Sequence, residues 1–156
     1  MRANAPLSVG IQTAGMLVGK TERTVRRWHD GGNIVSAKDH ATGRVMIPID
    51  EVTPHIPIPW DMDKSMMASR ADQGDAEAMN VVALYFMNEE QYELAFPWFK
   101  LAAEKGHPDA QHWLSKCYFK GWGTDRNQAL GLRWLGEAAN NGHAIAQYQI
   151  KTLHIL

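Results

Sequence analysis

The C-terminal half of the chain repeats itself, and this repetition limits the folds open to it. The segment GDAEA from Gly74 aligns with GHPDA from Gly106 at a shift of 32 residues, and the Gly106-His107 pair aligns with Gly142-His143 at a shift of 36. Within each unit, small and large apolar residues recur at the i, i+4, i+8 spacing of one helix face. Because a single helical hairpin cannot bury its apolar face, such units must stack on their neighbours. The pattern therefore predicts an α/α superhelical array of about two full repeats with a half repeat at each end.

The second unit carries the most complete motif. It reads A-x-x-x-L-x-x-x-Y-x-x-G-x-G from Ala110 to Gly123 and W-x-x-x-A-A-x-x-G-H from Trp134 to His143. This motif resembles the Sel-one-like repeat, a relative of the tetratricopeptide repeat, and the resemblance covers roughly residues 66–153. It implies an α/α superhelix that holds partner proteins and is rarely a catalyst. The first unit lacks the G-x-G loop, which predicts a tighter turn between its helices.

A cluster of prolines separates this array from what precedes it. Pro54, Pro57 and Pro59 fall within six residues. Each proline fixes its own φ and favours an extended conformation in the residue before it, so a helix cannot run through the cluster. The sequence therefore predicts an extended linker at residues 54–60, between an N-terminal domain of residues 1–53 and a repeat domain of residues 61–156.

The N-terminal domain contains a short basic helix after a tight turn. Gly19 interrupts one helical pattern, and Thr21 can cap the next helix by accepting its first free amides. Val25 and Trp28 share one face of that second helix, which predicts that they pack against the first helix. The opposite, solvent-facing side then carries three arginines, Arg23, Arg26 and Arg27.

A β-hairpin is predicted after the basic helix. Residues 34–38 and 44–48 read as two strands, and residues 39–43 read as the turn that joins them. The motif S-V-x-x-x-x-A-x-x-L-V-G-x-T-x-R-T-V-R-R-W-x-x-G-G-x-I, which begins at Ser8, resembles the MerR-like and excisionase-like winged helix-turn-helix family over about residues 7–53. Gly10 stands where that family usually has a Ser or Thr cap. The fold class expected is mainly α: a small domain of three helices and a hairpin wing, followed by the repeat array.

The resemblance implies that the second helix enters the major groove of double-stranded DNA. Arginine forks there match guanine edges or contact phosphates, and the hairpin reaches the neighbouring backbone. The candidate DNA-binding residues are Thr21, Glu22, Arg23, Arg26, Arg27, Lys38 and Arg44. A different interpretation stays open, in which these arginines make the helix soluble or pair with Glu22 and Asp30.

Charge, composition and the remaining motifs restrict the other functions. Residues 1–53 hold seven Lys and Arg against five Asp and Glu, whereas residues 54–156 hold nine against twelve. The modest excess of positive charge locates a possible polyanion surface in the N-terminal half. No nucleophile motif, phosphate-binding loop or zinc-type spacing occurs, so we expect no enzymatic activity, metal or cofactor. The single cysteine, Cys117, and the lack of a long apolar run favour a cytoplasmic protein without a membrane span.

Two classes of function follow. The first is a DNA-binding transcriptional regulator or adaptor whose repeats bind a protein partner, with a homodimer possible. The alternative is a protein-interaction adaptor whose helix-turn-helix no longer binds DNA, or a phage-type recombination or packaging accessory. Trp122, in the loop of the second repeat, is a candidate partner-binding residue, although it can equally fold back over its own helix pair. His107 and His143 follow repeat-equivalent glycines, so we expect a structural role for both.

Overall fold

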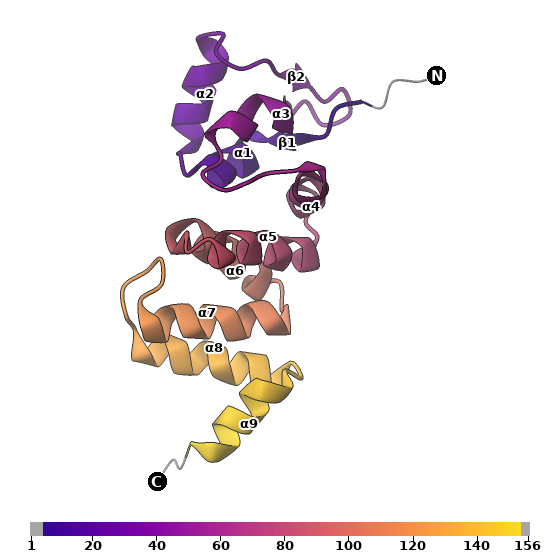
Figure 1. Cartoon of the computed structure of the whole chain (residues 1–156). Helices are drawn as coiled ribbons and strands as arrows, with labels where there is room; N and C mark the ends of the chain where they lie inside the picture. The colour runs from indigo at the N-terminus through magenta and orange to yellow at the C-terminus, as the bar shows by residue number, and fades with distance from the viewer. Residues whose placement is uncertain (1–4, 154–156) are drawn as a thin grey trace. The chain divides into compact units, whose positions relative to one another are not determined.

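The computed structural model describes residues 5–153. The chain divides into two compact units, Met1–Gly74 and Asp75–Leu156. Each unit is described by itself below (Figure 1). Within the described residues, no helix combines the length and the apolar character needed to cross a bilayer.

The N-terminal unit combines short helices with a small antiparallel sheet. In chain order its elements are β1 (Ser8–Gly10), α1 (Ile11–Val18), α2 (Glu22–Asp30), β2 (Ala37–Lys38), β3 (Val45–Pro48), α3 (Ile49–Val52), a 3₁₀ turn (Thr53–His55) and α4 (Met62–Asp72). The sheet order is β1-β3-β2, with both pairs antiparallel. The three helices and the hairpin expected from the sequence therefore occur in the expected order, although the first hairpin strand is limited to Ala37–Lys38.

The core of this unit is apolar and gathers residues from the sheet and the first helices. Val9 and Ile47 face each other across the β1–β3 pair, and both are fully buried. Leu17 of α1 and Val25 of α2 are fully buried as well. Trp28 is half-buried, and its ring lies against that of His55 with 4.9 Å between ring centroids. The inward face predicted for α2 is confirmed for Val25, whereas Trp28 stays partly exposed beside His55 of the proline segment.

The predicted linker belongs to the N-terminal unit and is not an extended spacer. Residues 53–55 form the 3₁₀ turn, and both Ile56 and Ile58 are buried, each 7% exposed. The helix α4 that follows makes contacts with β1, and the boundary between the two units lies at Gly74. This division differs from the predicted one because the isoleucines between the prolines supply an apolar face, which is more stable buried than in water.

The C-terminal unit consists of antiparallel helices that follow one another from α5 to α9 (Figure 1). They are α5 (Ala76–Asn88), α6 (Tyr92–Glu104), α7 (Pro108–Lys120), α8 (Gln128–Asn140) and α9 (Ala144–Thr152). Gly106 and Gly142 follow the second helix of each pair with φ of 88° and 92°. This left-handed conformation is unfavourable for other residues, so glycine recurs at this position in each repeat.

The small and large residues of the repeat pattern form the core of the array. Ala78, Val82 and Phe86 of α5 and Trp98 of α6 are at most 1% exposed. The trimmed turn between α5 and α6 contains Glu90, which has a left-handed φ of 57°. The longer loop between α7 and α8 spans residues 121–127. The tighter first turn expected from the sequence is confirmed, and it places a non-glycine residue in an unfavourable conformation.

Candidate functional site

The outward face of α2 carries three exposed arginines, Arg23, Arg26 and Arg27. Thr21 caps this helix, because its hydroxyl accepts the backbone N–H of Thr24 at 3.2 Å. Glu22, exposed in the first turn, lies where a negative charge favours the helix dipole. Within residues 5–153, none of the three guanidinium groups has an ion pair or a hydrogen bond to another side chain. The pairing of these arginines with Glu22 or Asp30, the interpretation left open above, is therefore not found.

A groove of about 380 Å³ lies between α2 and the hairpin. It is lined by Ile11, Gln12, Glu22, Arg26, Gly43, Arg44 and Val45. The groove brings together three of the predicted residues: Glu22 and Arg26 from α2, and Arg44 just before β3. Its lining is mostly polar and combines two guanidinium groups with the carboxylate of Glu22, so it carries one net positive charge.

The hairpin turn holds Lys38 and Arg44 at its two ends. The Asp39 carboxylate accepts the amide of Ala41 at 3.0 Å and the hydroxyl of Thr42 at 2.6 Å, and the Thr42 hydrogen bond is the main cause of a lowered pKa for Asp39. Lys38 is exposed and has no side-chain partner in the part of the chain that the structure describes. Arg44 is half exposed and differs from Lys38, because its Nη2 lies 3.4 Å from the Asp72 carboxylate.

Asp72, at the end of α4, is a central polar residue of this unit that the sequence analysis missed. Its side chain is only 4% exposed. Besides Arg44, its Oδ1 accepts the amide of Gly10 at 3.0 Å and the hydroxyl of Thr13 at 2.7 Å. Gly10 is the N-cap residue of α1 and has no side chain with which to cap it. Asp72 therefore supplies, from a distant part of the chain, the negative group that the start of α1 lacks.

The signal that would have revealed Asp72 is weak. The missing cap at Gly10 was visible in the sequence, but its replacement lies 62 residues away, on a helix assigned to the repeat domain. Sequence periodicity predicts contacts between residues three or four apart on a helix, or opposite one another in a hairpin. It does not predict a contact between two distant segments. Only the tertiary structure brings the three donors together.

The repeat histidines are structural, as expected. His107 and His143 are the N-cap residues of α7 and α9, and the Nδ1 of each accepts a backbone amide, from Ala110 at 3.2 Å and from Ala146 at 3.1 Å. The Nε2 of His107 lies 2.5 Å from the Glu77 carboxylate of the preceding repeat. The Nε2 of His143 likewise lies 3.5 Å from the Asp109 carboxylate, so both histidines cap a helix and tie it to the first helix of the repeat before it.

Two other titratable groups of the array are buried. His112 is 4% exposed, and its Nε2 lies 3.0 Å from the Gln149 amide oxygen. Burial holds the pKa of His112 below its usual value, so this ring is neutral at pH 7. Cys117 is fully buried, and burial raises the pKa of its thiol to about 12. The Cys117 thiol is therefore protonated and unsuited to nucleophilic chemistry. Among residues 5–153, no cluster of three or more His, Cys, Asp and Glu side chains could hold a metal ion.

Trp122 is half-buried and lies against the preceding repeat, not over its own helix pair. Its ring stacks on that of Tyr92 in α6, with 5.3 Å between centroids and 11° between planes. The following residue, Gly123, lies so close to α6 that an added Cβ would be 2.3 Å from the Tyr92 carbonyl oxygen. The loop is thus held against α6, and Trp122 contributes to packing between repeats.

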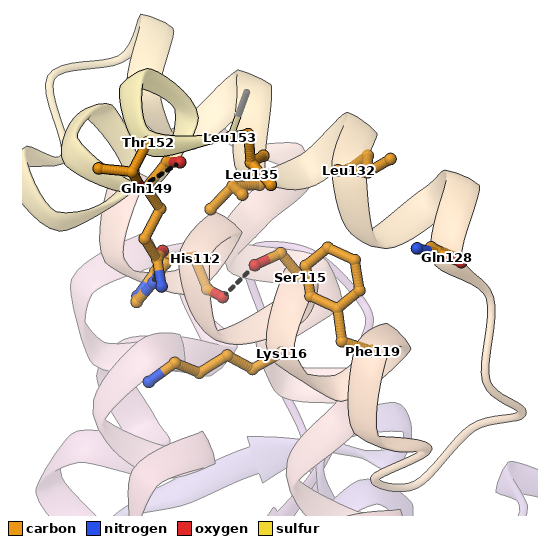
Figure 2. A pocket seen from close by; sticks show the side chains of 10 residues that line it. All are labelled: His112, Ser115, Lys116, Phe119, Gln128, Leu132, Leu135, Gln149, Thr152 and Leu153. Carbon is orange, nitrogen blue, oxygen red and sulfur yellow. Dashed lines mark hydrogen bonds between the residues drawn. The ribbon is translucent and has the colours of Figure 1, made fainter. Parts of the chain in front are cut away.

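A second hollow, of about 320 Å³, lies among α7, α8 and α9 (Figure 2). Its ten lining residues are His112, Ser115, Lys116, Phe119, Gln128, Leu132, Leu135, Gln149, Thr152 and Leu153. No candidate residue was predicted here from the sequence. We call this hollow the terminal groove.

Comparison with known proteins identifies the array. Residues 76–107 and 108–143 match the family model described as Sel1 repeat. Two relatives, both named DAP3-binding cell death enhancer 1, are 32% identical over 91 residues in Rattus norvegicus and 36% identical over 93 residues in Mus musculus. Each alignment covers 57% of this chain but only 18% of the relative, so the chain spans less than a fifth of the length of these relatives.

A solved structure shares the fold. The crystal structure of a Sel1 repeat protein from Oxalobacter formigenes superposes with a TM-score of 0.53 and covers 90% of this chain and 92% of that one. The two sequences are 20% identical, so this similarity concerns the fold alone. Residues 76–107 and 108–143 therefore match Sel1 repeats, and the chain shares the fold of a Sel1 repeat protein.

Proposed function

We propose that this chain is an adaptor that binds double-stranded DNA through α2 and a protein partner through its Sel1 repeats. The observation that carries the DNA part is the outward face of α2, where Arg23, Arg26 and Arg27 are exposed and unpaired among the described residues. Three cations gathered on one face repel each other, and the phosphates of a polyanion offset that repulsion. The counterions that the polyanion releases on binding add a favourable, salt-dependent term to the free energy.

The arrangement around α2 supports this proposal. Only residues 19–21 separate α1 from α2, and a hairpin follows, which is the order of a winged helix-turn-helix domain. With α2 in the major groove, Arg26 and Arg44 would face the same stretch of backbone across the groove they line. Lys38, at the end of β2, would reach the adjacent phosphates. The positions of Thr21 and Glu22 at the start of α2 would place them near the bases or the backbone.

The proposal that the repeats bind a protein partner rests on the repeat fold and on the names of two relatives. The relatives with 32% and 36% identity are called DAP3-binding proteins, and we propose that the repeats of this chain also bind a protein. No catalytic step is part of the proposal. A cytoplasmic location suits both functions, and either transcriptional regulation or a recombination accessory would use the same DNA surface.

A second candidate function is an adaptor that binds protein only. Two observations favour it: the relatives align with little more than half of this chain, and Arg44 is already engaged by Asp72. The small excess of positive charge in residues 1–53 points the same way. The two candidates differ in one property, the binding of duplex DNA at low salt.

The experiment is a fluorescence anisotropy titration of a labelled random duplex at several salt concentrations. We expect binding that weakens steeply with salt, and the Arg26→Ala/Arg27→Ala variant should lower the slope of log K against log salt by about two, at roughly one per lost phosphate contact. Affinity at the lowest salt should fall by about tenfold or more. The matched control is Lys100→Ala/Lys105→Ala, which removes two exposed charges from the array. An equal loss in both variants, or no binding by the unmodified chain, would favour the protein-only adaptor.

A further inference from the structure

Two imidazole rings stack where α9 meets α7. The ring of His112, in α7, lies 4.3 Å from the ring of His143 between centroids, with 28° between their planes. His143 is the N-cap residue of α9. The Nε2 of His112 donates to the amide oxygen of Gln149, also in α9, at 3.0 Å, because that oxygen can only accept (Figure 2). The two rings therefore hold the start and the middle of α9 against α7.

The contacts of both rings suit neutral imidazole. The Nδ1 of His143 accepts the amide of Ala146 at 3.1 Å, so this nitrogen carries no proton. A proton added there would face the N–H group and break the cap of α9. His112 is 4% exposed, and burial holds its pKa below the usual value of about 6.5. Two protonated rings stacked at this distance would also repel each other.

The charges around His112 do not compensate for a proton on its ring. Lys116 of the same helix and His143 of α9 disfavour the charged form, and Asp109 of α7 favours it. The Asp109 side chain is 62% exposed, so water screens its charge. The buried residues of α6 are uncharged. The side chains that α8 contributes to the terminal groove do not titrate; they are Gln128, Leu132 and Leu135.

Few apolar contacts anchor α9. Of its nine described residues, only Ala146 is buried, and it joins a small cluster with Leu135 and Ala138 of α8, with Ile150 packed at its edge. A helix with so little buried apolar surface opens locally at a low cost in free energy. The contacts of His112 and His143 are therefore a large part of what holds α9 in place.

The preceding junction, between α5 and α7, has the same cap without a second ring. His107 caps α7 as His143 caps α9, and each has a carboxylate partner in the repeat before it. The shift of 32 residues between the first two units places Asn80 at the position of His112. Asn80 is buried but does not titrate. Within the described array, the α7–α9 contact thus differs from the α5–α7 contact by one buried titratable ring.

We propose that the His112–His143 pair is a pH-sensitive switch, which releases α9 from α7 and α8 when His112 becomes protonated. In the released state His112 is open to water and binds a proton at the ordinary imidazole pKa of about 6.5. The released state therefore binds more protons below this pH, and the docked state loses stability as the pH falls. The switch requires His112 to be buried, and a segment that covered the terminal groove would keep it buried. It depends neither on DNA binding nor on partner binding.

The test is amide hydrogen exchange of the full chain, followed by NMR and corrected for the intrinsic exchange rate at each pH. Between about pH 6.5 and 4.5, we expect the opening constant of the α9 amides to rise by up to about tenfold per pH unit, the limit for one linked proton. The amides of α5 and α6 should keep their protection. An unchanged α9, or an equal change from α5 to α9, would overturn the switch.

Matched variants identify the titrating ring. His112→Asn introduces the residue of the preceding repeat, and the change over this pH range should fall to less than about twofold. His112→Gln, with a longer neutral side chain, should give the same result. His143→Asn keeps a helix cap and should retain most of the response, because burial of His112 is its main cause. His40→Gln, at an exposed histidine, and His154→Gln, outside the described residues, should leave the response unchanged.

A second measurement uses the unmodified chain. The Cε1–H signal of the His112 ring should report protonation over the same pH range in which the α9 amides lose protection. A His112 ring that becomes protonated while α9 stays protected would contradict the coupling. A response that survives both His112 variants, or that disappears in His143→Asn or His154→Gln, would overturn the assignment to His112.

Discussion

Replacing Asp72 by Ala is expected to lower the free energy of unfolding of the N-terminal unit by about 3 kcal/mol. The substitution leaves the Gly10 amide and the Thr13 hydroxyl without their acceptor, and it removes the partner of Arg44. Most of the loss comes from the first two contacts, because Arg44 is half exposed and water can solvate its charge. Urea denaturation followed by the NMR signals of Val9 and Val25 measures this unit separately from the array.

Two variants serve as controls for Asp72. Asp72→Asn keeps an oxygen acceptor of the same shape, so it should lose less than half as much. Asp50→Ala removes an exposed carboxylate of the same unit and should change the stability by no more than about 0.5 kcal/mol. A loss below about 1 kcal/mol for Asp72→Ala would contradict the role assigned to this carboxylate.

Replacing Gly123 by Ala is expected to destabilise the repeat array by about 2–4 kcal/mol. The new Cβ would lie 2.3 Å from the Tyr92 carbonyl oxygen and 2.8 Å from the Cβ of Phe96, and the backbone φ of 71° is itself unfavourable for alanine. Because one of these atoms belongs to the backbone of α6, the clash cannot be relieved by a side-chain rotation. Thermal denaturation monitored by helical circular dichroism gives the loss.

Gly142→Ala provides the matched control for the backbone term. Gly142 has a comparable φ of 92°, but nothing lies within 4 Å of an added Cβ. Its substitution should therefore cost only the left-handed conformation, about 1–2 kcal/mol. Equal losses for the two variants would show that the loop carrying Trp122 is not held tightly against α6.

The predictable parts of the fold are those that depend on residues close to one another in the sequence. Helix periodicity and recurring glycines predicted α5 to α9, because each repeat makes its main contacts with its neighbours in sequence. The Thr21 cap and the inward Val25 were predictable for the same reason. The basic face of α2 follows from helical spacing alone, since exposed arginines need no tertiary partner to be placed there.

The parts that could not be predicted depend on contacts between distant segments. The strand β1 has only three residues, too few for an alternating pattern, and it exists because β3 pairs with it. The prolines suggested a spacer, but the burial of Ile56 and Ile58 depends on a surface formed elsewhere in the unit. The hollow among α7, α8 and α9 was not predictable either, because its lining side chains come from three different helices.

The most direct test of the account is an NMR titration of the isotope-labelled chain with a short random duplex at low salt. We predict that the amide and guanidinium signals of Arg23, Arg26 and Arg27 shift, together with those of Lys38 on the hairpin, while the signals of α5 to α9 stay in place. Shifts spread over both units, or an unchanged spectrum at duplex concentrations near 100 μM, where non-specific DNA-binding domains associate (Kd on the order of 10⁻⁴–10⁻⁶ M), would contradict the assignment of α2 as the DNA-binding surface.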